Sequence, residues 1–158
     1  MGILKTANKA VDTYTSNHLS PAERQFVKKN PHVSALISTA ADKALQEAEQ
    51  RYQGEGHNGR GDAFRHAYWS ALMTREVGLQ MARQYGYAHE AVPPGDGVQR
   101  VIVGSGEMLT QPKREREMDQ FNNAAGRTIG ETNKDADDRA LADLVDQALK
   151  SGQLQLAP

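Results

Sequence analysis

The 158-residue chain contains no cysteine. This absence excludes disulfides, iron–sulfur clusters, zinc sites built on thiolates and cysteine nucleophiles. The chain also lacks any run of about 18 apolar residues, so we expect no transmembrane helix. A classical signal peptide is missing too, because Lys5, Asn8, Lys9 and Asp12 interrupt the apolar positions near the start. We expect a soluble protein that is cytoplasmic as synthesised, with export by a dedicated secretion system as the alternative.

An excess of either charge is missing as well. The chain has 19 Lys and Arg residues against 20 Asp and Glu residues, which leaves a formal net charge of -1. Proteins dedicated to nucleic-acid binding normally carry a clear basic excess, so nucleic acid is not an expected partner. The 38% of hydrophobic and 25% of charged residues are typical of a folded globular domain rather than a disordered or fibrous chain.

Apolar residues recur at helical spacing along most of the chain. Ser20-Pro21-Ala22-Glu23 is typical of a helix start, in which Ser20 caps the helix and Glu23 completes a capping box. Asp62 is expected to cap a helix that runs to Val77, with continuation past Gly78 to Tyr85 as an alternative. The other predicted helices cover residues 3–14, 33–52, 113–131 and 136–150.

Two Gly- and Pro-rich segments, Gly54–Gly61 and Pro93–Gly97, predict loops. Residues 98–103 form either a short strand or an apolar tether beside the second loop. We therefore predict an all-α protein, a single compact domain of about five to seven helices over residues 1–158. Its expected parts are N-terminal helices in residues 1–56, a site-bearing core in residues 57–131 and a C-terminal helix in residues 132–158.

The helix expected to begin at Asp62 has two unusual faces. One face is apolar, and the opposite face combines polar groups with the only tryptophan of the chain, which predicts a central helix buried nearly all round. Asp62 lies one turn before His66 and is close enough to orient its imidazole. In the plainer alternative, Asp62 is only the helix cap and His66 is a satisfied interior histidine. The apolar face consists of Phe64, Ala67, Tyr68, Ala71 and Leu72, and the polar face of Asp62, His66, Trp69, Met73 and Glu76, with Arg65 at its edge.

The segment around Met118 also combines an apolar stripe with a polar face. Asparagine in mid-helix competes for backbone hydrogen bonds, and Gly126 costs roughly 1 kcal/mol relative to alanine. Either this face binds a ligand and Gly126 makes room for it, or Gly126 permits close helix packing and the amides form ordinary buried hydrogen bonds. The expected core stripe is Met118, Phe121, Ala125 and Ile129, and the polar face is Glu115, Asp119, Asn122 and Gly126, with Asn123 beside it.

His89-Glu90 supplies a third polar element, although a solvated Glu90 is the simpler interpretation of that pair alone. Imidazole with carboxylate suits zinc or manganese, and oxygen ligands suit magnesium or calcium, so we expect one divalent metal. No HExxH or EF-hand spacing is present. The expected metal ligands are His66, His89, Glu90 and Asp119.

A metal-free alternative uses His66 as a general acid or base that Asp62 orients. Arg65, Asn122, Asn123 or Arg127 would then stabilise a developing oxyanion, and Ser70 is a further hydroxyl partner to consider. The candidate catalytic residues of both schemes are Asp62, Arg65, His66, Glu90, Asn122 and Asn123.

Three blocks of sequence resemble a poorly characterised bacterial helical domain family. They are DAFRHAYWSALMT (Asp62–Thr74), AHE (Ala88–Glu90) and MDQFNNAAGRTIG (Met118–Gly130). Effector-like, toxin-like and phage-related proteins carry this family, and the resemblance covers about residues 57–131. The resemblance implies no particular reaction. It implies that one site is shared by Asp62, Arg65, His66, His89, Glu90, Asp119, Asn122 and Asn123.

We expect a small hydrolase of effector or phage type, assisted by a metal, that acts on a phosphodiester, a lipid or a cell-envelope ester. The sequence does not identify the substrate, and a cognate immunity or carrier protein is the expected kind of protein partner. The main alternative is a non-enzymatic binding, adaptor or inhibitor module that uses the same polar groove without a metal. A purely structural role for the three polar clusters is the third interpretation.

Overall fold

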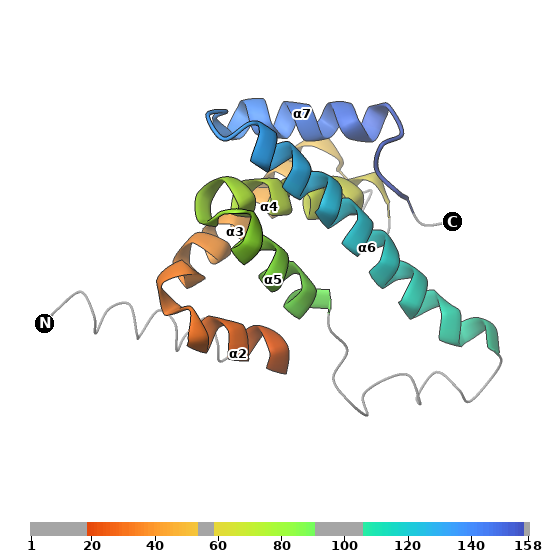
Figure 1. Cartoon of the computed structure of the whole chain (residues 1–158). Helices are drawn as coiled ribbons and strands as arrows, with labels where there is room; N and C mark the ends of the chain where they lie inside the picture. The colour runs from red at the N-terminus through yellow and green to blue at the C-terminus, as the bar shows by residue number, and fades with distance from the viewer. Residues whose placement is uncertain (1–18, 54–58, 91–105, 157–158) are drawn as a thin grey trace, which may run out of the picture.

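The computed structural model describes residues 19–53, 59–90 and 106–156, with only the backbone for residues 106–114. These residues form a single all-α domain of six α-helices and one short 3-10 helix, without a strand among them (Figure 1). The all-α prediction is therefore confirmed. The predicted helix over residues 3–14 and the segment 93–103 lie outside the described residues. The helices are α2 (Pro21–Lys29), α3 (Ser34–Arg51), α4 (Arg60–Val77), α5 (Leu79–Glu90), α6 (Gly106–Thr132) and α7 (Asp138–Lys150), and the 3-10 helix is Pro31–Val33.

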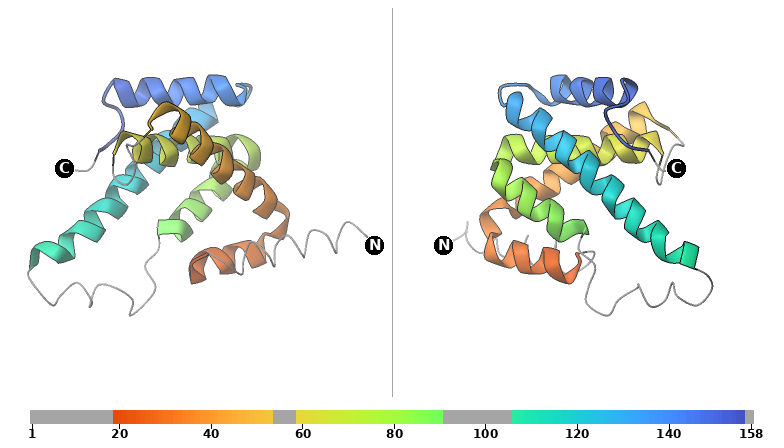
Figure 2. Two further views of the ribbon diagram at one scale, coloured as in Figure 1. Left: turned by 180° about the vertical axis from the view of Figure 1, so that it is seen from behind. Right: turned by 45° about the vertical axis from the view of Figure 1, so that its right-hand side comes forward.

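The central element is α4, which contacts α3, α5, α6 and α7. In the opposite views of Figures 1 and 2, α4 lies between α6 on one side and α3 on the other. Every residue from Gly61 to Thr74 is buried except Arg65. The prediction of a helix buried nearly all round is confirmed, so polar side chains on α4 must find partners inside the protein.

The helices α6 and α4 approach each other closely at two glycines of α6. A Cβ atom at Gly126 would lie 2.0 Å from the carbonyl oxygen of Ala67, and one at Gly130 would lie 2.4 Å from the carbonyl oxygen of Ala71. The two glycines are four residues apart, as are the two alanines, so they form matching rows of small residues. The two helix backbones therefore approach more closely than any larger side chain at these positions would allow.

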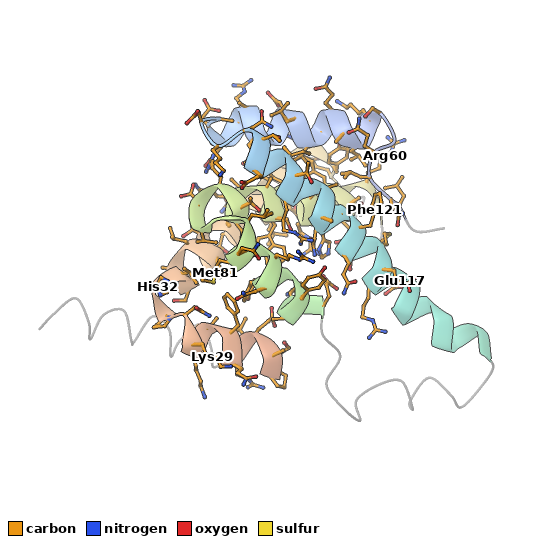
Figure 3. The ribbon with its side chains drawn as sticks, viewed as in Figure 1. Lys29, His32, Arg60, Met81, Glu117 and Phe121 are labelled. Carbon is orange, nitrogen blue, oxygen red and sulfur yellow. The ribbon has the colours of Figure 1, made fainter. Side chains whose placement is uncertain are left out.

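This packing rotates α6 away from its predicted orientation without reversing it. Phe121, expected in the core stripe, is 46% exposed and lies on the outer face of α6, away from the core (Figure 3). Met118 is buried, whereas Ala125 and Ile129 are only partly buried. The prediction for Phe121 was wrong because the small residues of the other face let α6 lie closer to α4.

The start of α2 is confirmed in detail. Ser20 Oγ accepts a hydrogen bond from the Glu23 backbone at 3.2 Å, and the Ser20 N–H donates to Glu23 Oε2 at 2.6 Å. The predicted cap of α4 was wrong, because this helix begins at Arg60 after Gly59 and places Asp62 inside its first turn. The early start leaves the Asp62 carboxylate available to side chains further along α4.

The bounds of α3 and α7 and the end of α4 at Val77 agree with the predicted ones to within two residues, whereas the start of α6 differs more. Gly78 has φ +88°, a left-handed conformation that ends α4, so one continuous helix to Tyr85 was wrong. The helix α6 begins at Gly106, well before the predicted residue 113. Asp137 caps α7 by accepting a hydrogen bond from the Ala140 backbone at 2.8 Å.

Ionic contacts fasten α7 across the top of the bundle, as viewed in Figure 1. Tyr68 donates a hydrogen bond to the carbonyl oxygen of Asp138 at 2.9 Å, and Arg75 pairs with the carboxylate of the same residue. None of the described helices is long and apolar enough to span a membrane.

Candidate functional site

Four ionisable side chains from three helices meet at the imidazole of His66. We call Asp62, His66, Glu90 and Asp119 the His66 cluster. His66 Nε2 lies 3.6 Å from Asp62 Oδ1 and 3.5 Å from Asp119 Oδ1, and its Nδ1 lies 3.8 Å from Glu90 Oε1. The predicted convergence of α4, the end of α5 and the middle of α6 is therefore present in the structure.

Three of these residues have the geometry of a metal site. One ligand atom from each of Asp62, His66 and Asp119 lies within 4.8 Å of the other two. Ligand bonds to zinc are about 2.0–2.2 Å, so two ligands of one tetrahedral ion lie about 3.4 Å apart. The separations of 3.5 and 3.6 Å from His66 Nε2 match this value closely. A small adjustment of Asp62 and Asp119 would let all three atoms bind one ion, provided that the Arg65 guanidinium, which contacts Asp62 Oδ1 and His66 Nε2, moves away.

The electrostatics of the cluster favour a neutral imidazole. Burial, followed by the positive charge of Arg65, lowers the pKa of His66 from 6.5 to about 4. The imidazole is therefore uncharged at neutral pH, which is the state that binds metals. Burial, followed by the negative charges of Glu90 and Asp62, raises the pKa of Asp119 from 3.8 to about 7. Burial and the neighbouring carboxylates thus disfavour the charged form of Asp119.

Two carboxylate oxygens of the cluster lack hydrogen-bond partners among the described residues. They are Glu90 Oε1 and Asp119 Oδ1, and both are buried. Burial also raises the pKa of Glu90. Buried polar atoms are normally hydrogen-bonded, so these two oxygens, on opposite sides of one imidazole, are unusual and open to a further partner.

Arg65 brings a positive charge into direct contact with the cluster. Its Nη2 lies 2.5 Å from Asp62 Oδ1 and 3.2 Å from His66 Nε2. The side chain remains 40% exposed, so it can change rotamer at little cost in burial. Arg65 therefore compensates the charge of Asp62 and stands at the solvent side of the cluster.

His89 does not join the predicted ligand set. Its Nδ1 lies 2.6 Å from Oε1 of Glu23 in α2, and its Nε2 lies 3.9 Å from Glu90 Oε1. Burial opposes the charged form, but the hydrogen bond and charge of Glu23 outweigh it and raise the pKa of His89. The compact triad contains Asp62 where the sequence analysis expected His89 and Glu90.

Glu23 belongs to the surroundings of the site, although it was not among the predicted site residues. This buried carboxylate completes the capping box with Oε2, while Oε1 accepts a hydrogen bond from Tyr85 at 3.2 Å and pairs with His89. In the sequence, the capping box alone accounts for a glutamate at this position, so nothing pointed to a second role. A glutamate that only caps a surface helix would be exposed. The burial of Glu23 therefore indicates a second role, and that burial is visible only in the fold.

Asn122 lies outside the His66 cluster. Its side-chain amide donates to the carbonyl oxygen of Gln155 at 2.9 Å, and its Oδ1 accepts from the Gln155 N–H at 2.8 Å. Both polar groups of this fully buried side chain are therefore used to hold the C-terminal segment. The geometry supports the interpretation of ordinary buried hydrogen bonds at this position.

We expect Asn122→Ala to cost about 2 kcal/mol of stability, because it leaves two backbone groups of Gln155 without partners. Hydrogen exchange measured by mass spectrometry should speed up around residue 155. The matched control is Asn133→Ala, whose amide bonds to Ile129 and Thr132 of α6 and should change this exchange little. Unchanged exchange in the Asn122 variant, with hydrolytic activity lost, would instead restore the predicted catalytic role.

Asn123 remains beside the cluster. Its Oδ1 accepts a hydrogen bond from Ser70 at 3.1 Å, while its Nδ2 is buried without a partner among the described residues. Burial dominates the pKa shifts of His66 and Glu90, and Asn123 influences both to a smaller degree. Ser70 is fully buried behind this amide, so it positions Asn123 rather than facing the cluster.

Gly126 and Arg127 do not contribute to the cluster either. Gly126 makes room for the backbone of α4 and not for a ligand. Arg127 is buried between α5 and α6, with its guanidinium carbon 5.8 Å from the ring centre of Tyr87. It also approaches α5 at Gly86, where a Cβ would lie 3.2 Å from Arg127 Nη1.

Comparison with known proteins identifies a family whose description names no function. No solved structure matches the chain. Residues 24–153 match the profile of a family described as a domain of unknown function, DUF6973. The matched span includes α4, α5, α6 and the whole His66 cluster. Because the match covers most of the chain, this protein belongs to the DUF6973 family.

Proposed function

We propose that this protein is a small hydrolase that uses one divalent metal bound by Asp62, His66 and Asp119. The observation that carries the proposal is the approach of three ligand atoms from α4 and α6 to within 4.8 Å of one another. The unpartnered Asp119 Oδ1 and the neutral imidazole of His66 support it, because a cation would supply the oxygen with a partner and the imidazole is in its metal-binding form.

The ligand set favours zinc or manganese over calcium. One imidazole and two carboxylates are typical of catalytic sites that keep coordination positions open, whereas calcium requires six to eight oxygen ligands. A metal in such a site supplies a Lewis acid for an ester or phosphodiester and acidifies a water molecule. The chain itself supplies the orientation of that metal and the groups around it.

Glu90 and Arg65 have separate roles in this proposal. Metal-binding histidines usually present their second nitrogen to a carboxylate, and Glu90 is the acid next to His66 Nδ1. Glu90 Oε1 lies 3.8 Å from Nδ1, so it must move closer when the metal binds in order to orient the imidazole and keep the tautomer with Nε2 unprotonated. Arg65 pairs with Asp62 and reaches solvent, so it is placed to stabilise negative charge that develops on a substrate at the mouth of the site.

The first test is calorimetric titration of manganese and zinc into protein that has been stripped with chelator. We expect one bound ion in the wild type and affinity weakened at least about 100-fold in His66→Ala, since loss of a direct ligand exceeds the usual effect of a group behind it. His32→Ala is the matched control, because His32 is exposed in the 3-10 helix. Thermal melts of each variant establish that it is folded.

Activity is then assayed on a chromogenic phosphodiester, a chromogenic carboxylic ester and phospholipid vesicles. Hydrolysis that requires the metal and disappears in His66→Ala supports the proposal. A protein that binds no metal and hydrolyses none of these compounds contradicts it and favours the non-enzymatic binding module instead.

The proposed biological setting is a bacterial effector, toxin-like or phage-related protein. Its support is the resemblance of three sequence blocks to a family found in such proteins. A cognate immunity or carrier protein is the partner that this setting implies. Co-purification from a producing strain, compared with the His66→Ala variant, tests whether such a partner covers the site.

A further inference from the structure

A cavity of about 70 Å³ lies beside the His66 cluster, between α3, α4 and the end of α5. This volume is several times the roughly 10–15 Å³ that a cavity needs to hold one water molecule. Two small side chains of α3 leave the space open, and the polar lining comes from the other two helices. The lining residues are Ala41, Ala44, Arg65, His66, Trp69 and His89.

The polar lining that the described residues give this cavity consists of nitrogen groups and contains no carboxylate. Trp69 contributes an indole whose Nε1 is buried and has no hydrogen-bond partner within the described part of the chain. The indole N–H is only a donor, so it requires an acceptor. The neighbouring rings of Tyr85 and His89 pack edge-on against Trp69, at centroid distances of 5.7 and 5.0 Å, and fix its orientation.

Arg65 adds a second, charged donor to the same cavity. Its Nη2 is engaged by Asp62, but a guanidinium carries five N–H groups in a fixed fork. Such a fork matches the oxygens of a phosphate or a carboxylate. The two residues that carry a charged donor and an orphaned indole N–H therefore both line one small space next to the proposed metal site.

We propose that this cavity binds an oxyanion of the substrate, a phosphate or a carboxylate group, through the Arg65 guanidinium and the Trp69 indole. An oxygen of the anion would accept the hydrogen bond of the indole N–H. The anionic group would lie beside His66, with the rest of the substrate directed toward the cluster. The identity of the oxyanion as part of a substrate rests on the proposed function, whereas its binding in the cavity does not. A hydrolase with this cavity would prefer anionic esters to neutral ones.

The acidic cluster next to the cavity predicts coupling between the two sites. Asp62, Glu90 and Asp119 repel an incoming anion unless a cation neutralises them. We therefore expect oxyanions to bind more tightly to the manganese-loaded protein than to the metal-free protein. By reciprocity, the oxyanion should tighten manganese binding by the same factor.

The test uses the fluorescence of Trp69, the only tryptophan in the chain. Sodium sulfate and sodium acetate are titrated separately into the full chain, with and without manganese, at an ionic strength held constant with chloride. We expect a saturable change with at least one of the two anions, and a tighter apparent affinity in the presence of manganese. Sulfate preference assigns a phosphate group, and acetate preference assigns a carboxylate group.

Two variants address the cavity directly. Ala41→Leu fills the space from a partly buried position, and Arg65→Gln removes the charged donor. Each substitution should lower the affinity for the preferred anion at least tenfold. The matched controls are Ala35→Leu, at an exposed position of the same helix, and Arg24→Gln, at an exposed position of α2, and both should bind as the wild type does.

The outcomes separate this proposal from the proposed function. Absence of any saturable response in either metal state, or wild-type affinity in both folded cavity variants, overturns the oxyanion site. Calorimetry with Trp69→Phe, which retains a ring but lacks the N–H, should show a similar loss. Anion binding that depends on Ala41 and Arg65 in a protein that binds no metal would support the cavity and contradict the hydrolase.

Discussion

Replacing Gly126 by alanine should unfold the protein or destabilise it by at least about 3 kcal/mol. The new Cβ would lie 2.0 Å from the oxygen, 2.7 Å from the carbonyl carbon and 2.8 Å from the Cα of Ala67. These are backbone atoms of the central helix, which cannot rotate away as a side chain does. The helices would have to separate, and the packing of α4 against its other neighbours would loosen with them.

The sign of this effect makes it informative. Alanine is favoured over glycine by about 1 kcal/mol in a helix interior, so propensity alone predicts a stabilised variant. Gly86→Ala is the matched control, because its Cβ would meet only the end of the flexible Arg127 side chain, at 3.2 Å. Denaturant unfolding followed by circular dichroism compares the two variants. Stability of Gly126→Ala at or above the wild-type level would refute the close approach of α4 and α6.

Replacing Asp119 by asparagine should stabilise the metal-free protein at pH 8 while it abolishes metal binding. The folded-state pKa of Asp119 is about 7, raised from 3.8 by burial and by the charges of Glu90 and Asp62. When folding raises the pKa of an acid, the protein loses stability as the pH rises from the pKa of the unfolded state to the pKa of the folded state. The loss is absent below about pH 4 and is complete above about pH 7. Asparagine has nearly the same shape and carries no charge, so it escapes the loss.

The full pKa shift corresponds to roughly 4 kcal/mol, and relaxation of the partly exposed carboxylate reduces the expected gain to about 2 kcal/mol. Unfolding is measured in chelator at pH 5 and pH 8, and the variant should gain at pH 8 far more than at pH 5. Added manganese should stabilise the wild type and leave Asp119→Asn unchanged. Asp135→Asn, at an exposed position beyond α6, is the control. A variant that is less stable than the wild type at pH 8 would show that Asp119 is an ordinary structural carboxylate.

Local sequence signals predicted those parts of the fold that depend on neighbouring residues. The capping box of Ser20 and Glu23 is confirmed because its four atoms lie within one turn. The burial of α4 is confirmed because a tryptophan and apolar bulk on its polar face would be unfavourable in contact with water. The start of the same helix was missed, since Gly59 caps it without a side-chain hydrogen bond and leaves no signature.

The orientation of α6 shows where a helical wheel fails. The wheel ranks faces by hydrophobicity, so it placed Phe121 inside and could not decide whether the glycine face meets a ligand or another helix. Packing instead depends on how closely two backbones can approach, and that requires knowledge of Ala67 and Ala71 on another helix. The same limit applies to His89, whose partner Glu23 is 66 residues away in the sequence.

The position of Glu23 has a consequence for protein engineering. The family match spans residues 24–153, yet Glu23 holds His89 from one residue before it and Gln155 is held by Asn122 two residues after it. A gene trimmed to the matched span would lose the helix cap, the carboxylate behind the cavity and the anchored C-terminal segment together. The smallest portable version of this domain, for grafting or fusion, therefore extends at least from Ser20 to Gln155.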